Sequence, residues 1–423
     1  MQTAVRLRRL CAHPLGMAVA ATAMLPTAAQ AAFVEDSTAS LTSTNIYFNR
    51  DFREGSGQSK REEWGQAFIL DMRSGFTEGT VGLGLDASAM LGLKLDSGRG
   101  RTGTDLLPIH DDGRAPDEFS RLALTAKARV SETELRYGSH VPELPLVKAS
   151  TSRLLPQVFE GTMLQSGDLS ENIDLHAARF NRVIDRAATG SQDLTLNNKN
   201  SRFRRKVTAD HLNLAGLDWR LSPHFTARYY YSGLEDVYRQ HYFGLLTKHS
   251  IGPGTLSSDL RLILSDDAGS AQGGKIDNRA INAMLSYALG AHKFGLGFQD
   301  MSGDTGFAYL DGSDPFLINF VQINDFANAD QRSWQARYDF DFSGVGIPGL
   351  SFMTRYITSD DARVAGSNER GGEWERDIEL KYVVQSGPLK DLFVRLRNAS
   401  FRSDFARDAD ENRLIVGYTL PIW

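Results

Sequence analysis

Apolar and polar residues alternate along most of this chain, in segments of about ten residues separated by clusters of Gly, Asn, Asp and Ser. From Val81 to Leu93 the odd-numbered positions are apolar, while Gly82, Asp86 and Ser88 stand among the even ones. The same alternation recurs at 334–342, 350–357 and 378–384. A period of two is that of a β-strand with one apolar face. A spacing of about 22 residues per strand and connection predicts an all-β chain of about 18 antiparallel strands.

The last of these segments, Arg413 to Trp423, carries an arginine on its polar face. Its other face is apolar, with Leu, Val, Tyr, Leu and Ile at positions 414, 416, 418, 420 and 422. A closing strand with a carboxyl-terminal aromatic residue is typical of outer-membrane barrels, whose assembly machinery reads it. Trp423 lies one residue out of phase with the apolar face, which weakens that interpretation of the end itself.

The amino terminus has the order of a secretory signal. Arg6, Arg8 and Arg9 precede an apolar run at 15–25, and Ala29-Gln30-Ala31 follows it. We expect a signal peptide at 1–31 and a single transmembrane β-barrel domain at 32–423. The apolar run is too short for a spanning helix. The one cysteine, Cys11, lies inside this segment, so the exported chain should have no thiol chemistry and no cysteine-metal site.

The distribution of basic residues is more informative than the net charge of -5, which only disfavours a nucleic-acid binder. Arginine and lysine repeatedly take the polar face of the predicted strands. In the dry core of a β-sandwich, burying each of these charges would cost several kcal/mol of folding free energy unless it were paired. In a water-filled lumen the charges stay solvated and the cost is small. The residues are Arg121, Lys127, Arg129, Arg228, Arg261, Arg337, Arg355, Lys381, Arg395, Arg397 and Arg413. The pattern therefore favours a barrel over a soluble sandwich.

A row of guanidinium groups along a pore can bind a carboxylate bidentately at one arginine after another. No single site then needs to hold the solute so tightly that it cannot move on. The alternative is that these arginines only pair with lumen acids such as Asp339, Asp341, Asp377 and Glu379. We expect that least for Arg395 and Arg397, because their own strand supplies no acid on the same face.

The alternation breaks from Ser139 to Gly167, a stretch that contains Lys148 and Arg153. Irregular segments of this length in compact folds tend to be functional. We expect this one to fold into the pore and narrow it, with an external flap as the alternative.

Several stretches, taken in order, resemble the OprD-type substrate-specific porins, the outer-membrane carboxylate channels. They lie at 45–51, 74–82, 152–157, 234–240, 333–339, 381–388 and 413–416. The resemblance implies an 18-stranded barrel with an inward-folded constriction loop, and a basic ladder for small carboxylates. Lys381, Arg395, Arg397 and Arg413 would then be ladder members and Arg153 a constriction residue. The polar-face pattern adds Arg129, Arg337 and Arg355 to the ladder, and the irregular segment adds Lys148.

The function we expect is passive, substrate-selective diffusion across the bacterial outer membrane. Within the resembling family, the stretches 179–200 and 241–251 favour cyclic or aromatic carboxylates over basic amino acids and peptides, which remain the alternative. Expected partners are small carboxylate solutes, outer-membrane lipid and lipopolysaccharide, and the barrel assembly machinery. The barrel would act as a monomer or a loose homotrimer, without nucleic acid, metal or cofactor.

Two other classes compete with a channel. A barrel enzyme is disfavoured because the sequence has no Gly-x-Ser-x-Gly elbow and no His-Glu-x-x-His motif. We therefore expect no catalytic residues. A surface adhesin would not need arginines on so many lumen faces.

Overall fold

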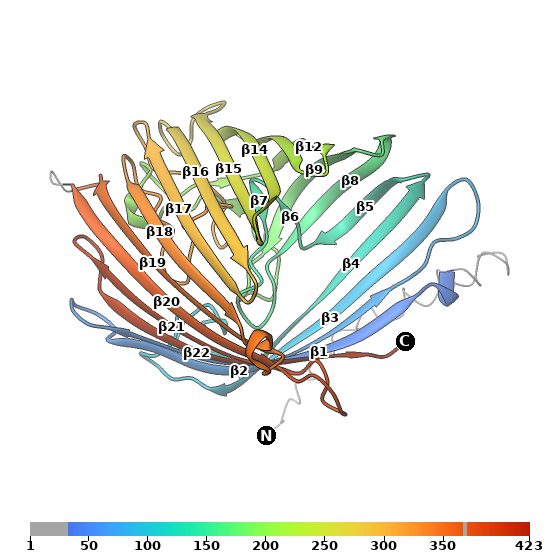
Figure 1. Cartoon of the computed structure of the whole chain (residues 1–423), viewed down its shortest axis with the longest axis horizontal. Helices are drawn as coiled ribbons and strands as arrows, with labels where there is room; N and C mark the ends of the chain where they lie inside the picture. The colour runs from blue at the N-terminus through green and yellow to red at the C-terminus, as the bar shows by residue number, and fades with distance from the viewer. Residues whose placement is uncertain (1–32, 367–369) are drawn as a thin grey trace, which may run out of the picture.

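The computed structural model describes residues 33–366 and 370–423. Eighteen antiparallel strands each pair with the next along the chain, and β22 pairs with β1 to close a barrel. Figure 1 shows the tilted strands, with the carboxyl-terminal end of β22 beside β1. The predicted signal peptide and Cys11 lie outside the described residues. The barrel strands are β1 Thr38–Phe52, β2 Lys60–Arg73, β3 Gly82–Asp96, β4 Glu118–Val130, β5 Thr133–His140, β8 Val158–Ser170, β9 Ile173–Ile184, β12 Leu212–Ser222, β13 Phe225–Leu234, β14 Tyr238–Ile251, β15 Gly254–Asp267, β16 Asp277–Leu289, β17 His292–Ser302, β18 Arg332–Asp341, β19 Leu350–Ala362, β20 Gly371–Val383, β21 Phe393–Ser403 and β22 Ala409–Pro421.

The predicted alternation places apolar residues on the outer face and polar residues inside. On β18, Trp334 is 56% exposed on the outside, whereas its neighbours Ser333 and Gln335 are buried. Leu296 on β17 and Leu396 on β21 are exposed in the same way. An apolar outer face is stable only against lipid, so the parity confirms the interpretation of these strands as membrane-facing. No helix in the described ranges has the length and apolar character needed to cross a membrane.

Short turns join the strands at one end of the barrel, and longer connections join them at the other. One short turn contains the 3-10 helix η3, Phe342–Val345. Four long connections at the opposite end hold elements that pack within the barrel, at 97–117, 141–157, 185–211 and 303–331. They include the hairpin β6 Glu143–Leu144 with β7 Val147–Lys148, the pair β10 Leu194–Thr195 with β11 Thr208–Ala209, and the 3-10 helix η2 Lys199–Ser201.

The irregular segment expected at 139–167 is shorter than the sequence suggested. Strand β5 extends to His140 and β8 begins at Val158, so only 141–157 is a loop. Gly138 and Gly161 lie opposite each other in this ladder, where an added Cβ would meet a backbone carbonyl at 2.1 Å in each case. These glycines interrupt the apolar pattern without ending the strands. The loop does fold inward, and Leu144, Val147 and Leu155 are buried.

The longest connection, 303–331, was not identified from the sequence. It returns through the lumen, and Asn319, Asp325 and Phe326 have almost no exposed surface. Together with the loops 141–157 and 185–211, it forms an apolar cluster against the inner faces of β8, β9 and β12–β17. We call this side of the lumen the packed sector. The inner faces of β18–β22 and β1 form the charged sector, which carries Arg50, Arg337, Arg355, Arg395, Arg397 and Arg413.

Candidate functional site

Two cavities meet in the lumen beside the charged sector. The larger measures about 890 Å³ and the smaller about 510 Å³, and Arg397 borders both. Arg153 and Arg395 also line the larger cavity, whereas Arg337 and Arg355 line the smaller. Arg397 therefore lies at the border of both spaces, and five of the residues predicted from the sequence line one or the other.

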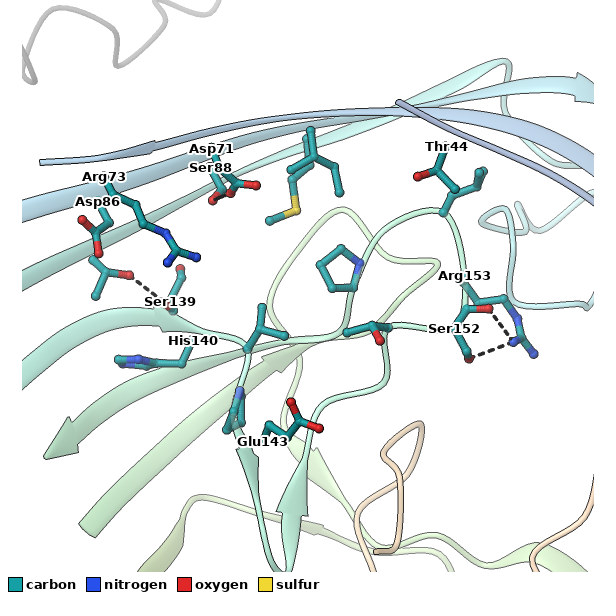
Figure 2. Close-up of a pocket in the computed structure, with 18 of the residues that line it drawn as sticks. Thr44, Asp71, Arg73, Asp86, Ser88, Ser139, His140, Glu143, Ser152 and Arg153 are labelled. Carbon is teal, nitrogen blue, oxygen red and sulfur yellow. Dashed lines mark hydrogen bonds between the residues drawn. The ribbon is translucent and has the colours of Figure 1, made fainter. Parts of the chain in front are cut away.

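Figure 2 shows how the larger cavity is walled. Asp71 and Ser88, from β2 and β3, lie on one side, and His140 and Glu143 lie across the space from them. Arg153 projects from the loop 141–157 at the edge of this space. The inward loop therefore narrows the passage, as the sequence predicted.

Three arginines converge on the buried ring of Phe48 in β1. The guanidinium carbons of Arg413, Arg153 and Arg50 lie 4.5, 5.1 and 5.6 Å from the ring centroid. Arg413 Nε donates to one oxygen of Glu411 at 2.6 Å, and Arg50 Nε donates to the other at 2.6 Å. One carboxylate thus faces two of three cations, which leaves excess positive charge around Phe48.

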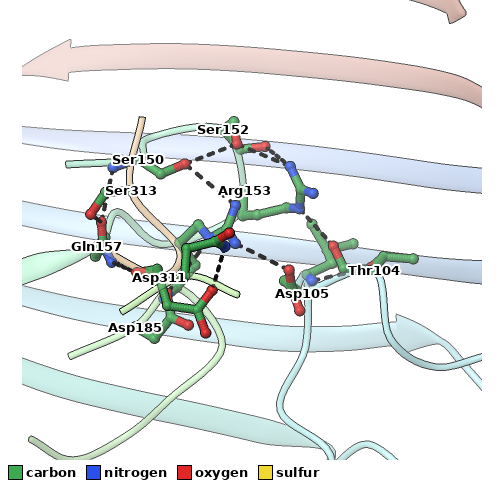
Figure 3. A network of polar contacts seen from close by, with 12 residues as sticks. Thr104, Asp105, Ser150, Ser152, Arg153, Gln157, Asp185, Asp311 and Ser313 are labelled. Carbon is green, nitrogen blue, oxygen red and sulfur yellow. Dashed lines mark hydrogen bonds and ion pairs between the residues drawn. The ribbon is translucent and has the colours of Figure 1, made fainter. Parts of the chain in front are cut away.

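Arg153 is held by backbone and hydroxyl groups, without an ion pair in the described part of the chain. Its Nε donates to the Thr104 carbonyl at 2.6 Å, and its Nη1 donates to the Ser152 carbonyl and hydroxyl at 3.0 Å each (Figure 3). Burial, and then the nearby Arg413 and Arg186, lower the pKa of this guanidinium well below its usual value. A carboxylate beside Arg153 would relieve that repulsion.

The same network joins two loops of the constriction. Ser313 Oγ donates to Gln157 Oε1 at 3.0 Å, and Gln157 Nε2 donates to the Asp311 carbonyl at 3.0 Å (Figure 3). The loops 141–157 and 303–331 are therefore fixed to each other, and the position of Arg153 is set by both.

Arg395 and Arg397 are paired with an acid, contrary to the expectation from their own strand. Glu379 on β20 lies 3.1 Å from Arg397 Nε and 3.5 Å from Arg395 Nε. The register explains this, because Glu379 is directly opposite Arg397 in the ladder. The neighbouring strand supplies the carboxylate that β21 lacks.

Arg337 and Arg355 are also paired. Arg337 binds Asp339 on its own strand at 2.7 Å, and Arg355 binds Asp377 on β20 at 2.6 Å. The alternative of pairing with lumen acids is thus realised for these ladder arginines. A guanidinium has five N–H donors, so a pair that fixes its direction leaves donors for a passing solute.

The remaining predicted residues lie apart from the two cavities. Lys381 sits 5.3 Å from the ring of Phe393, and the exposed Arg129 lies 4.1 Å from the ring of Phe76. Lys148 contacts Glu143 at 3.2 Å and Asp314 at 3.6 Å, so it ties the β6–β7 hairpin to the loop 303–331.

Several residues of the site were missed from the sequence. Phe48 and Arg50 share the inward parity of β1 with Ile46, which could have revealed them. Glu411 shares the face of Arg413 in the same way. Arg186, which binds Asp105 at 3.1 Å, lies in a loop, where no parity exists to find it.

The packed sector is anchored by a buried ion pair. Asp325 accepts from both terminal nitrogens of Arg202, at 2.6 and 2.7 Å, and from the Tyr309 hydroxyl at 2.9 Å. Burial alone would raise the pKa of Asp325, but Arg202 and Lys199 outweigh it and hold the pKa below the usual value.

The loop 303–331 is also fastened to the barrel wall on the other side of the lumen. Glu375 on β20 accepts hydrogen bonds from the backbone N–H groups of Ile323 and Asn324 at 2.8 and 2.9 Å.

The described residues contain no group of three or more His, Cys, Asp or Glu side chains that could hold a metal ion.

Comparisons with known proteins give the family. The model of the outer membrane porin, OprD family, matches residues 31–422. The porin-like protein GalP of Pseudomonas putida is 40% identical over 416 residues, covering 97% of this chain and 98% of that protein. The crystal structure of Pseudomonas aeruginosa OccK5 (OpdH) is 53% identical, with a TM-score of 0.84 over 92% of this chain and 99% of that one. Pseudomonas aeruginosa OpdK, crystallised with vanillate, is 42% identical, with a TM-score of 0.86 over 92% of this chain and all of that one. The chain therefore belongs to the OprD family of porins, whose place is the bacterial outer membrane.

Proposed function

We propose that this outer-membrane porin passes small carboxylate-bearing solutes, of the cyclic or aromatic kind, by passive diffusion without a covalent step. The path follows the charged sector. A solute meets Arg153 and Arg413 at the constriction and then the ladder residues Arg397, Arg395, Arg355 and Arg337.

The observation that carries the proposal is the convergence of Arg50, Arg153 and Arg413 on Phe48 with a single carboxylate, Glu411, between two of them. Charge-assisted hydrogen bonds to a guanidinium are among the stronger ones in proteins. The ladder arginines lie beside acids, with Arg395 and Arg397 sharing Glu379, so a solute held there can also be released. The related OpdK was crystallised with vanillate, an aromatic carboxylate, which supports the same class of solute.

A second candidate is a channel for basic amino acids. Asp71, Asp86 and Glu143 line the larger cavity together with Arg395 and Arg397. A solute with both a carboxylate and a cationic group could contact both kinds of side chain.

We also propose that the mature chain begins after Ala31, and that its closing strand β22 serves as the assembly signal. Trp423 lies beyond the end of β22, where its indole donates to Ser37 Oγ at 3.0 Å.

Liposome uptake by the purified protein tests the proposal, with benzoate, arginine and glucose as solutes. Benzoate should enter fastest, and Arg395→Ala with Arg397→Ala should slow benzoate selectively. Arg129→Ala is the matched control, because it removes a predicted ladder residue that lies outside both cavities. Equal rates for benzoate and glucose would refute carboxylate selectivity, and arginine entering fastest would favour the second candidate.

A further inference from the structure

A third cavity, of about 410 Å³, lies on the outer surface of the barrel. Arg279, Asp300 and Arg332 line it, on the adjacent strands β16, β17 and β18. Each stands between two buried, inward-pointing neighbours, so these three side chains point away from the lumen. The neighbours are Asn278 and Ala280, Gln299 and Met301, and Gln331 and Ser333. A solute passing through the pore does not meet this cavity.

Its height in the membrane follows from the aromatic residues below it. Phe298 and Trp334 lie opposite each other on β17 and β18, two residues toward the short turns from Asp300 and Arg332. Their rings pack with centroids 4.5 Å apart on the outer face. Outward aromatic residues of a barrel mark the boundary between hydrocarbon and headgroups. Two residues rise about 7 Å along a strand, so the cavity lies just beyond this aromatic boundary. The long connections of such barrels face outward, which assigns this end to the headgroups of the outer leaflet.

The arginines of this cavity are held in place by one contact each, and most of their hydrogen-bond donors have no partner in the described ranges. Arg332 is held through its Nε, 3.3 Å from the Asp300 carboxylate, and its side chain is 49% exposed. Arg279 donates through its Nε to Ser302 Oγ at 3.1 Å and forms no ion pair with a carboxylate in the ranges that the structure describes. In both residues the terminal N–H groups remain for a ligand. That planar edge fits the oxygens of a phosphate bidentately.

Three acids line the cavity, and two of them are paired with arginines. Asp300 is paired with Arg332, and Asp330 is paired with Arg363 and Arg370 at 3.0 and 3.1 Å. The third, Asp361, has no side-chain ion pair in the described ranges and accepts from Arg370 through its backbone carbonyl at 3.1 Å. The side chain without an acidic partner in the described ranges is Arg279, beside the opening between β16 and β18.

We propose that this cavity binds a phosphate group on the headgroup of a phosphorylated glycolipid in the outer leaflet. Arg279 and Arg332 hold the phosphate, and the acyl chains of the same lipid lie against Phe298 and Trp334 below. The two contacts have the order that a lipid requires, with the charged group above and the apolar chain beneath. Free phosphate lacks the second contact, so the cavity should retain the lipid in preference to the ion.

Native mass spectrometry of the purified protein with bis-phosphorylated lipid A tests this proposal. The wild type should retain the lipid, and Arg279→Ala with Arg332→Ala should weaken retention by at least about tenfold, since two charge-assisted contacts are lost. Arg239→Ala is the matched control and should retain the lipid, because Arg239 points outward at the same end, on β14, outside this cavity. Arg279→Lys with Arg332→Lys should retain the lipid to an intermediate extent, since lysine keeps the charge but lacks the planar guanidinium group.

Two further measurements make the proposal refutable. Dephosphorylated lipid A and inorganic phosphate alone should both bind the wild type much more weakly than the phosphorylated lipid. Equal retention of the dephosphorylated lipid would overturn the phosphate site, and equal binding of inorganic phosphate would overturn the lipid assignment. Unchanged gel mobility and pore conductance of the double variant would show that the barrel is intact. Equal retention by that intact variant and the wild type would also refute the site.

Discussion

The two sectors of the lumen treat buried charge in opposite ways. In the packed sector, Asp325 and Arg202 form a direct ion pair, and both side chains are nearly fully buried. In the charged sector, three arginines surround Phe48, Glu411 pairs with only two of them, and the third, Arg153, borders the larger cavity. A closed pair fixes loops, whereas an incompletely compensated group of cations can accept an anion from water. Pairing, and not the mere presence of arginine, therefore distinguishes the Phe48 cluster from the packed sector.

The largest effect on this contrast should come from removing two cations of the constriction, with Arg153→Ala and Arg413→Ala together. We expect the half-saturating benzoate concentration to rise at least about tenfold, because charge-assisted hydrogen bonds contribute about 1.5–3 kcal/mol each. Single-channel current block by benzoate measures it. Glucose uptake should not fall, since the passage becomes wider. A parallel loss of benzoate and glucose uptake would mean that the loops had collapsed.

A smaller effect on transport, but a clear one on stability, should follow Asp325→Asn in the packed sector. Breaking a buried pair leaves Arg202 uncompensated, at a cost of about 3–5 kcal/mol. Because the pKa of Asp325 is lowered in the folded protein, its contribution is complete above about pH 4 and is lost as the pH falls through the lowered value. Thermal unfolding at pH 7 should therefore show a lower Tm for the variant, and the gap should narrow in acid. A Tm gap that does not depend on pH would argue against the ion pair as the cause.

The smallest of these effects should follow Phe48→Leu, which keeps the apolar volume but removes the ring beside Arg50, Arg153 and Arg413. Cation–π contacts contribute about 0.5–2 kcal/mol, so we expect a several-fold weaker block by benzoate with little change in open conductance. Phe48→Tyr should restore the block, which a purely packing role would not predict. Phe76→Leu, beside Arg129 and away from both cavities, is the matched control and should have no effect on block.

The strands could be predicted because each one carries its own pattern. In an alternating segment such as 378–384, the local pattern alone predicts which residues point inward and which point outward. The structure confirms that prediction. The pattern failed where glycines replaced the expected residues, at Gly138 and Gly161, and in the loop 303–331, which has no period at all.

The pairing of the arginines could not be predicted in the same way. Arg397 meets Glu379 through the register of β20 and β21, and Arg153 meets Phe48 through a loop that crosses the lumen. The sequence pattern of neither segment indicates which residue the arginine will contact.

The sequence by itself determined that this chain forms a barrel of about 18 strands with arginines on its inner face, because strand period and charge are local properties. Only the tertiary structure decided which arginines are balanced by acids, which loops fill the packed sector and where the passage narrows. Those features depend on strand register and on loops returning through the lumen, which bring together residues such as Arg153, Arg413 and Phe48 that lie far apart in the chain.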